Sequence, residues 1–187
     1  MNRTLKLLII SDIFVFGGLG FVTPILSIFI KDNLIGGTIL AAGIASMIFL
    51  MTHATLQLLF AYKFNPKDRI WMLCVGTALI ALVPFGYIFS THVLHIYIIE
   101  FVYGVGAAFA YPSWSSLFTS NLEKGKRGFQ YSIYSSSVGI GTAITAGVGA
   151  WLAERTSFQL VFGLTGLLAI IGLLILFKLD RKILRKT

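Results

Sequence analysis

Apolar residues fill six long stretches of the chain, and short polar segments separate them. Each stretch is about 20 residues long, which is the length of helix that crosses a hydrocarbon core about 30 Å thick. The polar segments between the stretches are too short to form domains of their own. The pattern therefore predicts an all-α membrane protein, a single domain of six transmembrane helices over residues 1–187, with the helices near 7–30, 38–61, 70–90, 93–117, 129–153 and 157–178.

The first stretch does not have the features of a cleavable signal peptide. It is longer than a typical signal-peptide core of 7–15 residues, it contains Asp12, and no small-x-small cleavage site precedes the next stretch. We therefore expect it to form a helix of the mature protein. Pro24, Pro84 and Pro112 lie inside apolar stretches, where membrane helices tolerate proline, often with a bend.

The basic residues are distributed unevenly between the two sides of the predicted membrane. Thirteen of the fifteen Lys and Arg residues lie at the two ends of the chain or in the second and fourth connections, and only Lys31 and Arg155 lie on the other side. This positive-inside pattern predicts that both termini are cytoplasmic. The net charge of +8 is then expected to contact anionic lipid headgroups rather than nucleic acid.

Composition excludes a soluble protein and offers no sign of catalysis. The chain is 57% hydrophobic and 12% charged, against roughly 25% charged residues in soluble domains. Its one cysteine, Cys74, supports neither a disulfide framework nor a metal site, and the pair His92 and His95 has no third ligand nearby. Catalytic and nucleotide-binding motifs are absent from the sequence. We expect no metal, no cofactor and no enzymatic activity.

Small residues recur every four positions in the fifth stretch, at Ser135, Gly139, Ala143 and Gly147. This spacing places a groove on one helix face, where another backbone can approach closely. The groove could pack against another helix of the same bundle. Alternatively, it could form an interface that moves during function or that joins two subunits. The fourth stretch repeats the spacing at Gly104 and Ala108.

Three ionisable residues, Asp12, His53 and Glu100, lie within the apolar stretches. Such residues are functional candidates, because placing an acid at the centre of a membrane costs about 2.5–3.5 kcal/mol even on insertion scales. Asp12 is also explained by a place near the headgroups, at the positive end of its helix. His53 is also explained as a hydrogen-bonded packing residue, or as a proton-handling group that titrates near neutrality.

Glu100 shares a helix face with two phenols and an indole, because offsets of 3, 11 and 14 residues return to nearly the same angle. Such a face suits an aqueous cavity, although the aromatic residues nearest the helix end also fit an interfacial belt. On the second stretch, Gln57 shares a face with His53. The predicted substrate-binding or coupling residues are Glu100, Tyr103, Asp12, His53, Tyr111, Trp114 and Gln57.

Several segments resemble the Major Facilitator Superfamily of transporters. The segments "GVGAAFAYPSWSSLF" and "EKGKRGFQYSIYSSSVGIGTAITAGVGAWLAE" are similar to that family's fourth helix, following loop and fifth helix. The segment "GGLGFVTPILSIFIKD" resembles its first helix, with Gly18 and Pro24 at the spacing of a glycine-to-proline motif. In "LQLLFAYKFNPKDR", which resembles the loop after the second helix, Arg69 is the clearest match to the loop signature.

The chain also departs from the family pattern. Ala61, Asn65 and Pro66 stand where the loop signature has glycine, an acid and a first basic residue. Ala146 stands at the proline of the fifth-helix motif, and Glu100 stands where the fourth helix of the family often has arginine. An acid in place of an arginine favours a cationic or neutral solute.

The resemblance implies a secondary transporter. Family members have two six-helix halves, each made of two inverted three-helix repeats. This chain resembles one half, like the half-length members found in genome-reduced bacteria. The resemblance implies a small-molecule substrate, alternating access in a bacterial cytoplasmic membrane, and a parallel homodimer that completes the cavity. The first and fourth helices would face that cavity, and the second and fifth would form the moving interface.

Proton coupling through Glu100, Asp12 or His53 is one hypothesis for the mechanism. A different class of function stays open beside transport. It is a non-transporting membrane half-module that pairs with another subunit or scaffolds an assembly.

Overall fold

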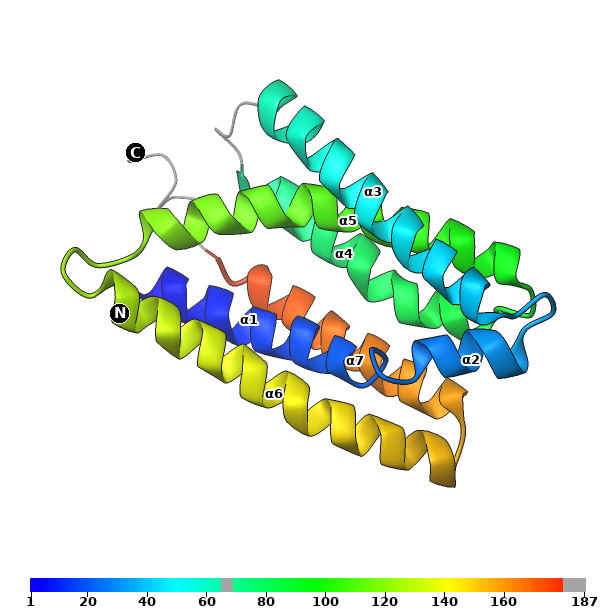
Figure 1. Ribbon diagram of the computed structural model, residues 1–187. Helices are drawn as coiled ribbons and strands as arrows, with labels where there is room; N and C mark the ends of the chain where they lie inside the picture. The colour runs from blue at the N-terminus through cyan, green and yellow to red at the C-terminus, as the bar shows by residue number, and fades with distance from the viewer. Residues whose placement is uncertain (65–68, 180–187) are drawn as a thin grey trace.

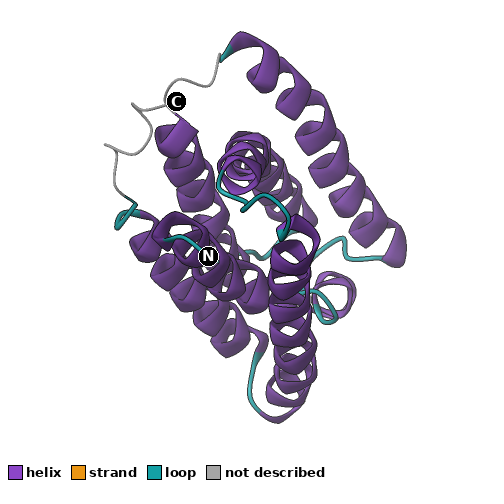
Figure 2. Cartoon of the chain, turned by 90° about the vertical axis from the view of Figure 1, so that its left-hand side faces the viewer, coloured by secondary structure: helices purple, strands orange, loops and turns teal. Residues whose placement is uncertain are grey.

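A computed structural model describes residues 1–64 and 69–179, except the side chain of Arg69. These residues form helices joined by loops, with no strand among them (Figures 1 and 2). Helices α3 to α7 are each long and apolar enough to cross a membrane, which agrees with the predicted all-α membrane fold. The helices are α1 (Arg3–Gly20), α2 (Leu26–Asn33), α3 (Ile39–Lys63), α4 (Arg69–Ile88), α5 (Val93–Ser120), α6 (Arg127–Arg155) and α7 (Phe158–Leu176).

The first apolar stretch forms two helices, α1 and α2, instead of the single helix that the hydropathy pattern predicts. Residues 21–25 interrupt it with tight turns, in which the Phe21 N–H donates to the Gly18 carbonyl at 3.1 Å. Pro24 lies in this break and has no N–H to continue a helical ladder. By contrast, α4 and α5 continue through Pro84 and Pro112.

The helices pack in two groups, which Figure 1 shows one above the other. Helix α5 packs against α3 and α4, and α1 packs against α6 and α7. The contact between α4 and α7 joins the groups, whereas α1 and α5 touch only slightly. The start of α1 and the α5–α6 loop lie at the same end, where the Asn2 side chain donates to Asn121 Oδ1 at 2.8 Å.

The backbones of α6 and α1 lie very close together where α1 ends, at Phe21. A Cβ atom at Gly149 would lie 2.6 Å from the Phe21 carbonyl oxygen, so only glycine fits there. The Thr145 hydroxyl donates to the Gly17 carbonyl, near the turn where α1 ends. Small residues and a hydroxyl thus provide the packing and hydrogen bonding that membrane helices use in place of a hydrophobic driving force.

The small-residue stripe of α6 lies on a different face and is exposed along its whole length. Ser135, Gly139, Ala143 and Gly147 are all exposed, and a Cβ added at either glycine would meet nothing within 4 Å. The stripe therefore does not pack inside this bundle. In α5, by contrast, Gly104 packs against Phe49 and Thr52 of α3, so the same spacing there serves a contact within the chain.

Candidate solute-binding site

Asp12 lies on α1, about 14 Å from the start of that helix at 1.5 Å per residue. Its side chain is buried, with 7% of the residue exposed. The Tyr134 hydroxyl of α6 donates a hydrogen bond to Asp12 Oδ2 at 3.0 Å. The packing of α6 against α1 therefore supplies the acid with its one partner among the described residues.

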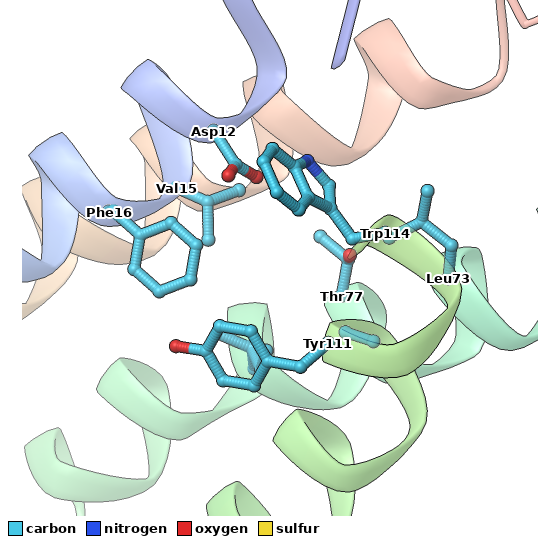
Figure 3. A pocket seen from close by; sticks show the side chains of 9 residues that line it. Asp12, Val15, Phe16, Leu73, Thr77, Tyr111 and Trp114 are labelled. Atoms are coloured by element: carbon cyan, nitrogen blue, oxygen red, sulfur yellow. The ribbon is translucent and has the colours of Figure 1, made fainter. Parts of the chain in front are cut away.

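A small pocket borders Asp12 between α1, α4 and α5 (Figure 3). Its volume is about 20 Å³, which is room for a group the size of a water molecule, and the pocket is partly open to the outside. Asp12 is the charged member of the lining, and Thr77 contributes a hydroxyl. Aromatic rings of Phe16, Tyr111 and Trp114 form much of the remaining wall.

Trp114 forms the inner side of the pocket. Its ring stacks on Phe118 with a centroid distance of 4.6 Å and lies 4.7 Å from the Tyr134 ring. Its Nε1 group is buried and has no hydrogen-bond partner in the described part of the chain. These ring contacts fix the indole beside the Asp12 carboxylate (Figure 3).

Glu100 lies toward the other end of the bundle, on α5, about 10 Å from the start of that helix. It is 4% exposed and accepts a hydrogen bond of 2.6 Å from the Tyr87 hydroxyl of α4. Tyr87 is itself only 2% exposed. Glu100 is not part of the Asp12 pocket lining, so the two acids occupy separate sites.

The acids share one electrostatic property. Among the residues that the structure describes, neither Asp12 nor Glu100 forms a salt bridge with a basic side chain. Each is instead stabilised by a single phenol. Burial of such an acid favours binding of a proton or a cation, because one neutral hydrogen bond replaces only part of the hydration that the carboxylate loses.

An aromatic ladder runs between the two acids. The His53 ring of α3 lies 4.9 Å from the Tyr111 ring and 5.9 Å from the Phe49 ring, and Phe49 stacks on Tyr103 at 4.2 Å. His53 Nε2 is buried and has no hydrogen-bond partner within the described residues. Gln57 is partly exposed one turn further along α3.

The structure thus groups the predicted site residues in a way the sequence did not show. Asp12, Tyr111 and Trp114 meet at one pocket, His53 borders Tyr111, and Glu100 pairs with Tyr87 elsewhere. Sequence reasoning missed Tyr87, Tyr134 and Thr77. The available signal was a phenol within or beside an apolar stretch, since the hydroxyl of a buried tyrosine usually finds a partner.

The loop signature predicted around Arg69 lies mostly outside the described residues. Arg69 opens α4, but its side chain lies outside the described residues, as do Asn65 and Pro66 of the loop signature. Over residues 1–64 and 69–179, no group of three or more His, Cys, Asp or Glu side chains is arranged to hold a metal ion.

Comparisons with known proteins agree on the family. The chain is 31% identical over 74 residues to the voltage-gated purine nucleotide uniporter of Rattus norvegicus, a match that covers 38% of this chain and 17% of that protein. The fold is similar to the crystal structure of the POT family transporter PepTSo, with a TM-score of 0.73 and 18% identity. That match covers 95% of this chain and 37% of the solved chain.

The present chain thus spans less than half the length of either protein. Its fold is similar to that of a solved transporter, and the apolar helices α3 to α7, with the family match that follows, make it an integral membrane protein. The family model for the Major Facilitator Superfamily matches residues 8–187, nearly the whole chain. The chain belongs to the Major Facilitator Superfamily.

Proposed function

We propose that this protein is a secondary transporter of a small cationic or neutral solute, which works by alternating access as a parallel homodimer. The observation that carries the proposal is the buried acid Asp12 beside a pocket, with no basic partner among the described residues, in a chain of a transporter family. Asp12 is the proposed solute-binding group. Glu100, with Tyr87, is the second proposed coupling acid.

The helix contacts support an arrangement of two inverted three-helix repeats, with α1 and α2 together counted as the first of six helices. Exchanging α1 with α5, α3 with α6 and α4 with α7 maps each major contact onto another. The packing of α1 on α6 and α7 becomes the packing of α5 on α3 and α4. Inverted repeats are expected to give this correspondence.

The exposed faces of α3 and α6 support the proposed dimer. The α6 stripe of Ser135, Gly139, Ala143 and Gly147 is a shallow groove, and the exposed face of α3 carries bulky side chains such as Met47, Met51 and Leu58. Bulky side chains of one copy would fill the groove of the other, and vice versa about a two-fold axis. The dimer would lie in a bacterial cytoplasmic membrane with both termini cytoplasmic, as the basic residues indicate.

Cysteine cross-linking tests this interface. In a Cys74→Ala background, copies with Gly139→Cys are mixed with copies with Met51→Cys, and we expect an intermolecular disulfide between them. Gly128→Cys, at an open glycine near the start of α6, is the control outside the stripe and should cross-link much less. A full-length chain that runs as a monomer in lipid nanodiscs, with no cross-link, would contradict the homodimer.

Uptake by proteoliposomes tests the transport function. The full chain is reconstituted, a pH or ion gradient is imposed, and a panel of amines, sugars, nucleosides and amino acids is offered. We expect uptake of at least one cationic or neutral solute, and its loss with Asp12→Asn. Folded, dimeric protein that transports no member of any class would count against the proposal.

The alternative is a non-transporting half-module that pairs with a different subunit. It is favoured by the altered loop signature, in which Ala61, Asn65 and Pro66 replace the family's residues. A stable complex with one other membrane protein, together with no uptake by the chain alone, would support this alternative.

A further inference from the structure

The Asp12 carboxylate has no positively charged partner among the described residues. It is buried, the described residues place no basic side chain in contact with it, and its one hydrogen bond falls on Oδ2. Oδ1 is therefore available to a donor from outside the protein. A buried carboxylate attracts either a proton or a cation that can donate hydrogen bonds.

The small volume of the pocket beside Asp12 favours a cation with a small head group. At about 20 Å³, the pocket beside Asp12 has room for one water-sized group. A primary ammonium group, with its three N–H donors, is close to the size of a water molecule. A quaternary ammonium group is larger, because it carries a methyl group at each position, and it has no N–H group to donate to Asp12 or Thr77, so we expect it to bind much less well.

The wall chemistry matches an ammonium group in two further ways. The hydroxyl oxygen of Thr77 can accept a second hydrogen bond, and no hydrogen bond to another side chain occupies it among the described residues. The rings of Phe16, Tyr111 and Trp114 border the same space (Figure 3), and aromatic rings can attract a cation. Among the residues whose side chains the structure describes, none in the lining carries a positive charge.

The burial of the lining shows on which side the rest of the ligand would lie. Phe16 and Tyr111 are partly exposed, whereas Asp12, Thr77 and Trp114 are buried, so the outer side of the pocket lies beside these two rings. Those rings are stacked with centroids 5.7 Å apart. An alkyl or aralkyl substituent leaving the ammonium head would contact their apolar surfaces.

We propose that the Asp12 pocket binds the head of a primary alkyl or aralkyl ammonium compound and rejects quaternary ammonium compounds. Asp12 Oδ1 and Thr77 Oγ1 accept hydrogen bonds from the head, and Tyr134 holds the carboxylate in place. This inference deepens the proposed transport function and rests on it for calling the ligand a substrate. Binding itself does not require transport.

Calorimetric titration of the full chain in lipid nanodiscs tests the inference. Butylammonium is the ligand, and tetramethylammonium and butanol are the comparison probes. We expect butylammonium to bind at least tenfold more tightly than either probe, and Asp12→Asn to weaken its binding at least tenfold. Asp32→Asn is the matched control, because it removes the same charge from an exposed position on α2 and should leave binding unchanged.

Other results would overturn the inference. Equal binding of tetramethylammonium, or unchanged butylammonium binding by Asp12→Asn, would contradict the pocket's assigned chemistry. If butylammonium does not bind at all, the Asp12 carboxylate is neutralised by a proton and does not bind an ammonium group. If Asp12→Asn does not fold, Thr77→Val serves instead, since it keeps the shape, removes the acceptor and should weaken binding severalfold.

The same protein separates this inference from the proposed function. Butylammonium binding without uptake of any solute would sustain the pocket's chemistry and contradict transport. Uptake of another solute class, with no butylammonium binding, would sustain transport and contradict the ammonium assignment.

Discussion

The two buried acids have the same local chemistry and different surroundings. Asp12 of α1 accepts a hydrogen bond from Tyr134 of α6, and Glu100 of α5 accepts one from Tyr87 of α4. Tyr87 is almost wholly enclosed and its bond to the acid is the shorter, at 2.6 Å against 3.0 Å. Tyr134 is only half-buried, and the pocket lies beside its acid.

The difference shows what decides whether a membrane-buried acid has room for a ligand. A phenol that is fully buried, such as Tyr87, can satisfy the acid with a hydrogen bond and pack so closely that no cavity is left beside it. A half-buried phenol such as Tyr134 fixes one carboxylate oxygen of Asp12 and leaves the other without a hydrogen bond from the described residues, in an acid that borders a pocket. The predictions below test this distinction.

The largest expected effect is on uptake. Asp12→Asn removes the charge beside the pocket, and we expect at least a tenfold loss of solute uptake, equivalent to about 1.4 kcal/mol or more of binding free energy. Glu100→Gln should retain most of the uptake, because the amide oxygen still accepts from Tyr87, and should reduce its pH dependence. Uptake and pH dependence both unchanged in Glu100→Gln would remove Glu100 from the mechanism.

The largest expected effect on stability is at the contact between α1 and α6, which brings Tyr134 to Asp12. Gly149→Ala places a Cβ against the Phe21 backbone, so we expect it to lower the free energy of unfolding by about 2–3 kcal/mol. Gly163→Ala of α7, where an added Cβ would also meet nothing within 4 Å and which lies outside the proposed dimer interface, is the control and should be neutral or stabilising by about 0.5–1 kcal/mol. Denaturation in mixed micelles measures both. Equal destabilisation would mean that α6 does not pack on α1 through Gly149.

The phenols themselves give a smaller difference. Tyr87→Phe leaves Glu100 buried without its donor and should cost about 1–2 kcal/mol of unfolding free energy. Tyr134→Phe should cost less than about 1 kcal/mol, because a water molecule has room to replace the hydroxyl beside Asp12. A larger cost at Tyr134 than at Tyr87 would reverse the comparison between the two regions.

The smallest effect is expected between the two regions, at His53. Its Nε2 group has no partner among the described residues, so His53→Phe keeps the ring contacts with Phe49 and Tyr111 and should change stability by less than about 1 kcal/mol. Uptake should fall by less than about threefold, which corresponds to a change below about 0.7 kcal/mol. A tenfold loss would instead show that His53 handles a proton or the solute.

Much of the fold was predictable from the sequence. Helices lie over all six apolar stretches, because a chain in hydrocarbon must satisfy its backbone hydrogen bonds internally. The break at residues 21–25 was not predicted, because hydropathy averages over a window and does not show that Pro24 and the tight turns before it interrupt the ladder. The glycines of α6 show the same limit: Gly147 and Gly149 are alike in sequence, and only the second meets another helix.

The candidate site divides in the same way. The sequence by itself determined that Asp12, His53 and Glu100 would lie on apolar helices and that Tyr111 and Trp114 would share a face of one helix, because hydropathy and helical periodicity are local properties. Only the tertiary structure decided which acid has a pocket. Tyr134 lies 122 residues from Asp12 in the chain, and its position depends on how α6 packs against α1. Contacts between distant helices, and the space left beside them, arise from side-chain packing that no single segment encodes.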